Sequence, residues 1–335
     1  MNFTKYILMF SSLFMLVGCK SQSSATNTVK EASVKNWQTV VVKDGSKPVE
    51  RHEAAFVHVK NRFYLLGGRG IRPVSIYDTK TGTWSQGTKP PIELHHFQPV
   101  VFNDKIYIIG AMTGEWPSET PTKHVYSYDP ATDLWLKGGE IPENRRRGST
   151  GNVIHNDKIY ISCGIKNGHL GDYKNWLDVY DPKNGSWEIL ADAPRARDHF
   201  QAVLANNSIY LLAGRNSTTP NSFGNTIGAI DVYNIATNTW KTLPNNLPTR
   251  RAGNMAVLYQ NQIYVIGGES DTQEPAHAEV EVLDLKTNMW TKSASLVVGR
   301  HGSGVIIFDD ELFIASGCGK RGGEPELFSM EKYGD

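Results

Sequence analysis

The sequence lacks a large net charge, a long apolar run beyond its first 20 residues, and a serine-nucleophile motif. The net charge is only +1 at pH 7, whereas a general nucleic-acid binder needs a basic field or stripe. A helix that crosses a bilayer needs about 20 apolar residues, and no run after residue 20 approaches that length. No G-x-S-x-G nucleophile elbow is present either. We therefore expect no nucleic-acid partner, no membrane-spanning domain and no catalytic serine.

The first 18 residues have the features of an export signal. Lys5 gives a short basic region, and YILMFSSLFMLV forms an apolar core. The following LVGC (Leu16–Cys19) resembles the lipobox of bacterial lipoproteins, which implies that Cys19 is lipidated. An ordinary signal peptide with a chance cysteine is the alternative. Residues 19–35 would then comprise the lipidated cysteine and a polar, Ser/Thr-rich segment, which predicts a flexible tether.

The lipobox resemblance implies a membrane partner, reached through a lipid on Cys19, while the folded domain stays in water. Lys20 and Ser21 follow the cysteine without an acidic run, unlike the acidic surface-export signals of some lipoproteins. We therefore expect an exported protein on the periplasmic side of an outer membrane. The cell surface is the alternative location.

A unit of about 50 residues recurs along the rest of the chain. Its first signature is an apolar, often aromatic run that ends in small residues: FYLLGG, IYIIGA, IYISCG, IYLLAG, IYVIGG and LFIASG. Its second signature is a tyrosine or leucine that precedes a tryptophan, which occurs at Trp84, Trp135, Trp187, Trp240 and Trp290. The spacings of 51, 52, 53 and 50 residues indicate an internal repeat.

Each unit predicts a four-stranded β-sheet. The two apolar runs are separated by the pairs KN, ND, ND, NN, QN and DD, and tight hairpins favour such asparagine- and aspartate-rich pairs. Two shorter strands follow, the last ending near the tryptophan. These motifs resemble the kelch repeat. The resemblance spans residues 36–335 and implies an all-β, six-bladed kelch-type β-propeller, in which radially stacked blades bury one another's faces.

The two chain ends are expected to share one blade. The sixth unit ends before any tryptophan, while Trp37 stands 47 residues before Trp84, about one period. We predict that the N-terminal strand with Trp37 is the outer strand of the last blade. Cys163 and Cys318 each lie beside a glycine in the repeated second strand. We expect two small buried residues, with a disulfide in an oxidising envelope as the alternative.

Arginine occupies one repeat position, at the entrance to the first strand, in five of the six units. Leu94 stands there in the second unit, and the arginines are Arg51, Arg147, Arg197, Arg251 and Arg300. The position lies on the face that carries the loops of most variable length, where binding sites usually lie. A ring of guanidinium groups around the channel mouth would suit a carboxylate, sulfate or phosphate. The alternative is a structural role, in which each arginine pairs with carbonyls or acids of neighbouring blades.

Further polar residues come to the same face by register. The candidate ligand-binding residues beside the five arginines are His52, His95, His96, His199, His301, Arg69 and Arg215, and the two acids are Glu53 and Glu269. Glu269 has a structural alternative as the ion-pair partner of a neighbouring arginine. Imidazole is a common metal ligand, but no tight ligand spacing is present and the arginines would repel a cation. We therefore expect no metal and no other cofactor.

The expected function is non-catalytic binding of an anionic carbohydrate or an envelope protein through the loop-rich face. A sugar binder needs aromatic platforms, which Trp116, Phe223 and Trp176 could supply. Export, six blades and an arginine-rich mouth are also similar to those of periplasmic sialic-acid mutarotases. That resemblance implies the alternative of an acidic-sugar mutarotase or epimerase, with Glu269 or Glu53 as acid or base and Arg197, Arg251 and Arg300 as a clamp. A scaffold for protein assembly, with an exposed apolar patch, is the third possibility.

Overall fold

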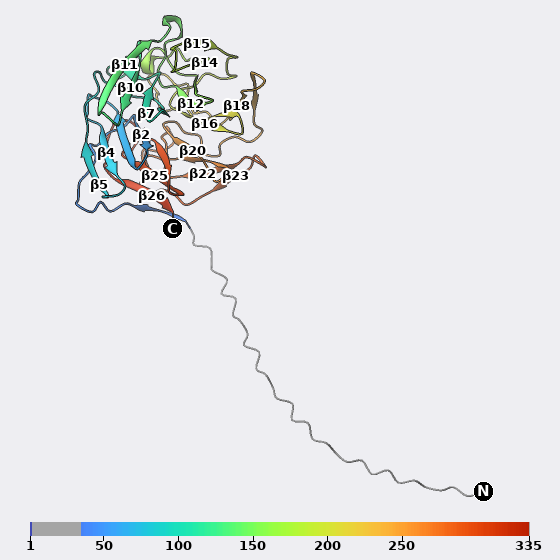
Figure 1. The fold of residues 1–335 in the computed structure, drawn as a ribbon. Helices are drawn as coiled ribbons and strands as arrows, with labels where there is room; N and C mark the ends of the chain where they lie inside the picture. Colours follow the sequence, from blue (N-terminus) through green and yellow to red (C-terminus); the bar gives the residue numbers. More distant parts are fainter. Residues whose placement is uncertain (2–34, 335) are drawn as a thin grey trace. The chain divides into compact units, whose positions relative to one another are not determined.

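The structure is a computed structural model that describes Met1 and residues 35–334 (Figure 1). The chain divides into Met1–Val34 and Lys35–Asp335, and the signal peptide, Cys19 and most of the tether lie outside the described residues. The second unit consists of six four-stranded sheets, arranged in Figure 1 as the blades of a propeller. Over the described part of the chain, no helix is long and apolar enough to span a membrane. The predicted six-bladed, all-β fold is confirmed.

The first three blades follow one another along the chain. Blade one contains β2 (Ala54–Val59), β3 (Arg62–Gly67), β4 (Ser75–Asp78) and β5 (Thr83–Gln86). Blade two contains β6 (Val100–Phe102), β7 (Lys105–Ile108), β10 (His124–Asp129) and β11 (Leu134–Glu140), and its long loop carries the small hairpin β8 (Met112–Thr113) and β9 (Thr120–Pro121). Blade three contains β12 (Gly151–His155), β13 (Lys158–Ser162), β14 (Leu177–Tyr180) and β15 (Trp187–Ile189).

The last three blades complete the ring. Blade four contains β16 (Gln201–Ala205), β17 (Ser208–Leu212), β18 (Asp231–Asn234) and β19 (Thr239–Thr242). Blade five contains β20 (Met255–Tyr259), β21 (Gln262–Ile266), β22 (Val280–Asp284) and β23 (Trp290–Lys292). Blade six contains β24 (Val305–Phe308), β25 (Glu311–Ala315), β26 (Met330–Gly334) and β1 (Asn36–Thr39). Two 3-10 turns, η1 (Glu143–Arg145) and η2 (Gly168–Leu170), lie in connections.

The predicted tight turns join the first two strands of each blade. In five of the six hairpins both central residues have positive φ, as type I′ turns require. These pairs are Asn103–Asp104, Asn156–Asp157, Asn206–Asn207, Gln260–Asn261 and Asp309–Asp310. Four of the five contain only asparagine and aspartate, which tolerate this conformation better than most other residues.

The N-terminal strand closes the ring as predicted. β1 pairs antiparallel with β26, with Trp37 opposite Tyr333. Their ring centroids are 5.5 Å apart, and Trp37, 5% exposed, packs in an apolar cluster with Leu296 and Leu312. Residues near the two ends of the chain therefore share one hydrogen-bonded sheet, and the propeller has no open seam.

The core lies between the blades. Six apolar clusters are present, and each joins residues of two neighbouring blades, including blade six with blade one. Glycines after the second strand allow the close approach. A Cβ at Gly267, whose φ is +60°, would lie 2.3 Å from the carbonyl oxygen of Arg300 in the next blade. This position needs glycine for both its conformation and its contact.

Trp37→Ala tests the closure. Removing this buried ring should lower the free energy of unfolding by about 3–5 kcal/mol, since a large side chain leaves a cavity between two blades. Urea unfolding of the full chain measures the loss. Trp116→Ala is the matched control, because Trp116 is 59% exposed and its removal should cost less than about 0.5 kcal/mol. Equal losses for the two variants would contradict the closure.

Candidate ligand-binding site at the channel mouth

The five arginines of the repeat do not line the channel mouth. They are 0–2% exposed, and each guanidinium binds inside its own blade. Arg251 donates to the carbonyls of Val265 and Gly267 and, at 2.6 Å, to Glu281 Oε2 on the third strand. The corresponding pairs are Arg147–Asp178, Arg197–Asp231 and Arg300–Glu331. The prediction that these guanidinium groups converge on the mouth is therefore wrong, because carboxylates and carbonyls of the same blade hold them inside it.

In blades one and two, other residues take the place of the buried arginine–carboxylate pair. Arg51 has Ser75 in place of the acid and donates to the carbonyls of Gly67 and Pro73. Burial, with a smaller effect from the charge of Arg72, lowers the pKa of Arg51 to about 9. In blade two, Leu94 takes the place of arginine and Tyr126 that of the acid, and both belong to one apolar cluster. The arginine and its acid are lost together, which avoids leaving a buried charge unpaired.

A closed ring of hydrogen bonds surrounds the mouth, one link for each pair of neighbouring blades. In blades two to six, the residue two positions after the arginine position donates its N–H to the corresponding residue of the preceding blade. The acceptor is a carbonyl oxygen except at Ser149, whose Oγ accepts the N–H of His199. The N–H of Ala54 closes the ring on the carbonyl of Gly302. The six ring residues all have φ between +48° and +67°. They are Glu53, His96, Ser149, His199, Gly253 and Gly302.

This conformation is easy for glycine and costs other residues roughly 1–2 kcal/mol. Blades five and six use glycine there, whereas blades one, two and four have the larger polar residues Glu53, His96 and His199 at the same backbone position. Strained residues that carry chemistry are typical of functional sites. The ring therefore points to the mouth between blades one and four as the functional region.

Two of the six ring residues border a cavity of about 520 Å³ on the loop-rich face. Its lining includes Glu53 and His96 from the ring and Arg69, Arg215 and Glu269, which follow the second strands. Small-molecule sites are usually concave pockets of about this size or somewhat larger, with a few convergent polar groups. The cavity is large enough for a ligand the size of a sugar.

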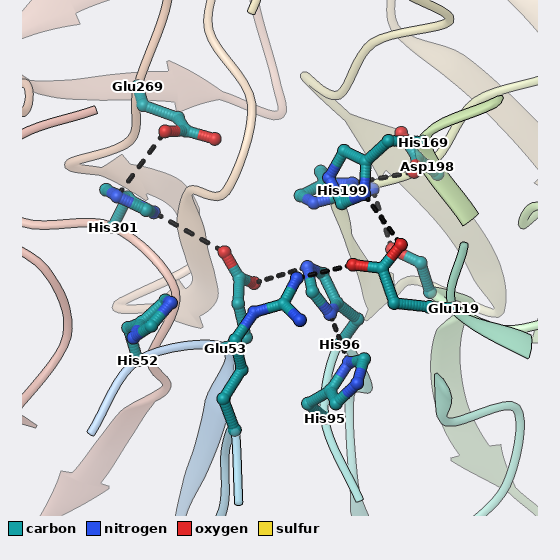
Figure 2. A network of polar contacts seen from close by, with 12 residues as sticks. His52, Glu53, His95, His96, Glu119, His169, Asp198, His199, Glu269 and His301 are labelled. Carbon is teal, nitrogen blue, oxygen red and sulfur yellow. Dashed lines mark hydrogen bonds and ion pairs between the residues drawn. The ribbon is translucent and has the colours of Figure 1, made fainter. Parts of the chain in front are cut away.

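Two carboxylates flank His301 in this region (Figure 2). Its Nδ1 lies 3.7 Å from Glu53 Oε1, and its Nε2 lies 3.4 Å from Glu269 Oε2. Burial alone would lower the pKa of His301, but the charges of Glu269 and Glu53 raise it to about 9. Burial alone would raise the pKa of Glu53, but His199 and His301 lower it to about 2. At neutral pH this array is a protonated imidazole between two ionised carboxylates.

Three further imidazoles meet beside the array (Figure 2). His96, His169 and His199 have nitrogen atoms within 4.8 Å of one another. Burial and the neighbouring imidazoles lower the pKa of His96 well below its usual value. Glu53, Glu269 and His301 also have ligand atoms within 4.8 Å of one another, so two groups at the mouth have the residue types that hold metal ions.

The remaining polar candidates are engaged in pairs. Arg215 donates to Glu269 Oε1 at 2.7 Å, with both side chains 2% exposed, so Glu269 has the ion-pair role considered as its structural alternative. His52 lies 2.7 Å from Glu326. Arg69 donates one N–H to Glu119 Oε1, and its side chain is 23% exposed. Among the described residues, the other N–H groups of Arg69 have no hydrogen-bond partner.

His95 is fully buried beneath the mouth. Its Nε2 lies 3.1 Å from the carbonyl oxygen of Gly114, and its Nδ1 hydrogen bonds with His96. His95 does not line the mouth cavity. The predicted contact of His95 with a ligand is therefore wrong, because His95 contacts the ring residue His96 instead. It therefore positions His96.

Sequence reasoning missed His169 and Glu119. Both lie in loops of irregular length, His169 in η2 and Glu119 in the loop of blade two, so no repeat register marks them. His169 Nδ1 lies 3.0 Å from Glu119 Oε2. The only signal in the sequence was the length of these loops, which is where functional residues concentrate.

Two of the three proposed aromatic platforms line the cavity. Trp116, 59% exposed, and Phe223 are at its edge. Trp176 is not in its lining, and its ring lies instead under Arg145, whose guanidinium carbon is 4.2 Å from the centroid. The placement of Trp176 as a platform at the mouth is therefore wrong, because Arg145 covers it.

The two described cysteines are free and fully buried, so the disulfide alternative does not apply to them. Cys163 donates to the carbonyl of Arg195 at 3.4 Å. Burial raises the pKa of the Cys163 thiol to about 12. A thiol in this state is an inert packing group.

Comparison with known families and proteins agrees with this architecture. The family described as "Attractin/LZTR1 beta-propeller" matches residues 13–268, and the Kelch motif matches residues 250–296. The chain is similar to Kelch-like protein terF of Aspergillus terreus, with 29% identity over 81% of this chain and 61% of that protein. It is 26% identical to Kelch-like protein 38 of Mus musculus over 76% of this chain and 42% of that protein. The chain thus spans about two fifths to three fifths of the length of these relatives.

A solved structure titled "Structure of YjhT" has the same fold. It covers 85% of this chain and 95% of that chain, with a TM-score of 0.71 and 15% sequence identity. At this identity the likeness concerns the fold alone.

The role of the buried pair Arg251–Glu281 in blade five can be tested by replacing it with the residues that stand at the same positions in blade two. Arg251→Leu should lower the free energy of unfolding by about 3–5 kcal/mol, because it leaves Glu281 buried and unpaired. Combining it with Glu281→Tyr copies Leu94 and Tyr126 and should recover at least about 1 kcal/mol. Urea unfolding measures both. Lys60→Ala, in an exposed pair with Asp104, is the control and should have little effect. A double variant no more stable than Arg251→Leu would refute the pairing.

The array around His301 predicts a pH dependence of stability. Because the folded-state pKa of His301, about 9, lies above the unfolded value near 6.5, its contribution is complete below about pH 6.5. The contribution is lost as pH rises through 9. Between these pH values the free energy of unfolding should fall by up to about 3 kcal/mol more than in His301→Gln, at about 1.4 kcal/mol per pKa unit. Denaturant unfolding at several pH values measures it. The exposed His58→Gln should keep the wild-type slope, and a His301→Gln slope equal to the wild type would contradict the assignment.

Proposed function

We propose that this chain, which belongs to the Attractin/LZTR1 family of β-propellers and carries a kelch motif, is an exported, lipid-anchored propeller whose mouth cavity binds an acidic sugar. Export and the lipid anchor at Cys19 rest on the LVGC segment of the sequence. A kelch-type propeller carries variable loops on a rigid scaffold and is suited to protein binding in general. The cavity at the mouth supports the narrower proposal.

The observation that carries the proposal is the set of side chains at the left-handed ring positions. Glu53, His96 and His199 stand where blades five and six have glycine. Glycine suffices where the carbonyl and N–H make the ring bonds, as at Gly253 and Gly302. Ser149 also uses its Oγ, which accepts the N–H of His199. No ring bond uses the side chain of Glu53, His96 or His199. Glu53 and His96 line the cavity, and the imidazole ring of His199 packs against that of His96, so these larger side chains serve the mouth.

The cavity also offers the groups that sugar recognition needs. Trp116 provides an exposed ring at its edge, on which the apolar face of a sugar can stack. Arg69 is partly exposed and has N–H groups that are not used in its bond to Glu119. It can therefore donate two parallel hydrogen bonds to the carboxylate of a ligand. Arg215 is fully committed to Glu269 and His169 at its two terminal nitrogens. Among the mouth arginines, Arg69 is therefore the one placed to select an acidic sugar.

An acidic-sugar isomerase is the second candidate, and the specific observation in its favour is the array of Glu53, His301 and Glu269. Acid–base catalysis is most efficient when the pKa of the group lies near the working pH. Here the pKa of Glu53 is about 2 and that of His301 about 9. Both lie far from neutrality, so binding without turnover is the leading proposal.

Protein binding has its own candidate surface at the other end of the channel. There a hollow of about 450 Å³ is lined mostly by apolar side chains, among them Val57, Val101 and Val257. This is the kind of apolar patch that a docking site for a protein partner would use. It supports an envelope-protein partner at the end away from the sugar cavity.

A thermal-shift screen of the full chain tests the acidic-sugar proposal. We expect N-acetylneuraminic acid or glucuronic acid to stabilise the protein, and neutral N-acetylglucosamine to have a smaller effect. A ligand at 100 times its Kd adds about 2.7 kcal/mol to the stability. Arg69→Lys keeps the charge but loses the fork, so it should weaken the acidic sugar about tenfold. Trp116→Ala should weaken both classes of sugar.

Phe328→Ala is the matched control, because Phe328 is 42% exposed and is not part of the cavity lining. Its sugar shifts should equal those of the wild type. If no acidic sugar shifts the unfolding temperature, or if Arg69→Lys responds like the wild type, the proposed function fails. Anomer-resolved NMR of a stabilising sugar then separates binding from isomerisation, since only an enzyme would accelerate the exchange of anomers.

A further inference from the structure

We infer that His96, His169 and His199 form a binding site for a divalent transition-metal ion, with Zn²⁺ as the best fit. The inference goes beyond sugar binding, because it concerns a metal ion. It shares His96 and His199 with the ring that supports the sugar proposal and adds His169. The ring centroids are 4.6 Å apart for His96 and His199, 5.2 Å for His169 and His199, and 5.7 Å for His96 and His169. Each of the three imidazole rings thus packs against the other two.

The hydrogen bonds of the three rings favour the tautomer that binds metal. His169 Nδ1–H donates to Glu119, and His199 Nδ1–H donates to Asp198 at 2.6 Å. A carboxylate or carbonyl on one nitrogen is the usual way in which proteins orient a metal-binding imidazole. In the neutral form of both rings, the form that binds a metal ion, the unprotonated nitrogen is therefore Nε2.

The same holds for His96 through His95. His95 Nε2 lies 3.1 Å from the carbonyl of Gly114, so Nε2 carries the proton of a neutral His95 and Nδ1 is its acceptor. His96 Nδ1–H donates to that acceptor. His96 Nε2 is then also unprotonated. Each of the three rings therefore has a lone pair on an unprotonated Nε2, and one nitrogen of each ring lies within 4.8 Å of the others.

One of these lone pairs has no other use. His199 is 7% exposed, and its buried Nε2 has no hydrogen-bond partner among the described residues. A buried polar atom without a partner costs about 1–3 kcal/mol, and a metal ion would satisfy it. The three rings also line a small void of about 10 Å³, close to the volume that one water molecule needs.

The charges around the cluster favour a cation. The expectation of no metal rested on five arginines at the mouth, which are instead buried in the blades. Arg69 and Arg215, the two arginines that are near, are paired with Glu119 and Glu269. Asp198 adds a further carboxylate beside His199. The long contact of 3.3 Å between Arg215 Nη2 and His169 Nε2 is the one hydrogen bond that the metal would replace.

Three neutral imidazoles are the donor set of open zinc sites, in which water fills the fourth position. Bond lengths of about 2.0–2.1 Å place tetrahedral ligand nitrogens about 3.3 Å apart, so the rings must draw together slightly. His169, on the η2 turn, is the ligand outside the backbone ring and can adjust. Glu53 Oε2 lies 3.5 Å from His96 Nε2 and is placed to accept a hydrogen bond from water on the metal.

Metal titration of the full chain, purified without a polyhistidine tag and stripped with a chelator, tests the inference. We expect one equivalent of Zn²⁺ in competition with a chromophoric chelator, and visible absorption typical of four-coordinate Co²⁺. His169→Ala and His199→Ala, on different elements, should each weaken Zn²⁺ by about 100-fold or more. Glu119→Gln, which removes the carboxylate that orients His169 and pairs with Arg69, should weaken it by about 10–100-fold.

His52→Ala is the matched control, because His52 lines the same cavity but bonds to Glu326 outside the cluster. It should keep the wild-type affinity. Less than one equivalent of Zn²⁺ on the wild type, unchanged affinity in His169→Ala and His199→Ala, or equal losses in His52→Ala would each overturn the site. Sugar shifts measured in the presence of chelator remain a separate result, so failure of the metal site does not decide the sugar proposal.

Discussion

The rest of the structure depends on the residue at the arginine position of each blade. In blades three to six its guanidinium binds a carboxylate of the third strand inside the same blade. In five of the six blade interfaces, its carbonyl accepts the N–H of the glycine that ends the second strand of the preceding blade. One residue thus fixes the inside of a blade and its attachment to the next. Breaking a buried ion pair is costly because it leaves an unpaired charge. Within the described blades, the pair is absent only where Ser75 and backbone carbonyls bind Arg51 or where Leu94 and Tyr126 replace both partners.

With the blades fixed in this way, the backbone ring two residues further along has little freedom. Its six residues share one left-handed conformation, whatever their side chains are. The symmetric backbone can therefore carry asymmetric chemistry. Glu53, His96 and His199 place acid and imidazole groups over blades one, two and four, while Gly253 leaves space beside the ring of His301 and Gly302 leaves space beside Glu53. The strain of the non-glycine residues is held by the hydrogen bonds of the ring.

The sequence predicts whatever the repeat register carries. Trp37 reveals the closure because it falls one period before Trp84, and Glu53, His96, His199 and His301 reveal the mouth because they share repeat positions. Register gives a backbone position but not the direction of a long side chain. Arg251 turns into its blade because Glu281, 30 residues later, lies within reach on β22, and the sequence hints at this only through the joint change at Leu94 and Tyr126. His169 and Glu119 lie in loops without a register, so only the folded chain shows that they reach the ring.

The electrostatics of the mouth limit how a ligand can bind there. Most ion pairs at the mouth are already formed, as for Arg215 with Glu269 and Arg69 with Glu119. A charged ligand therefore cannot gain a full new ion pair without sharing or displacing an existing one, and the net gain from a buried pair is small after desolvation. What the prebuilt network supplies is orientation, because its donors and acceptors are fixed before the ligand arrives. Selection at this mouth should therefore come from the geometry of the groups that remain free, above all the N–H groups of Arg69 that are not bonded to Glu119, more than from the total charge around them.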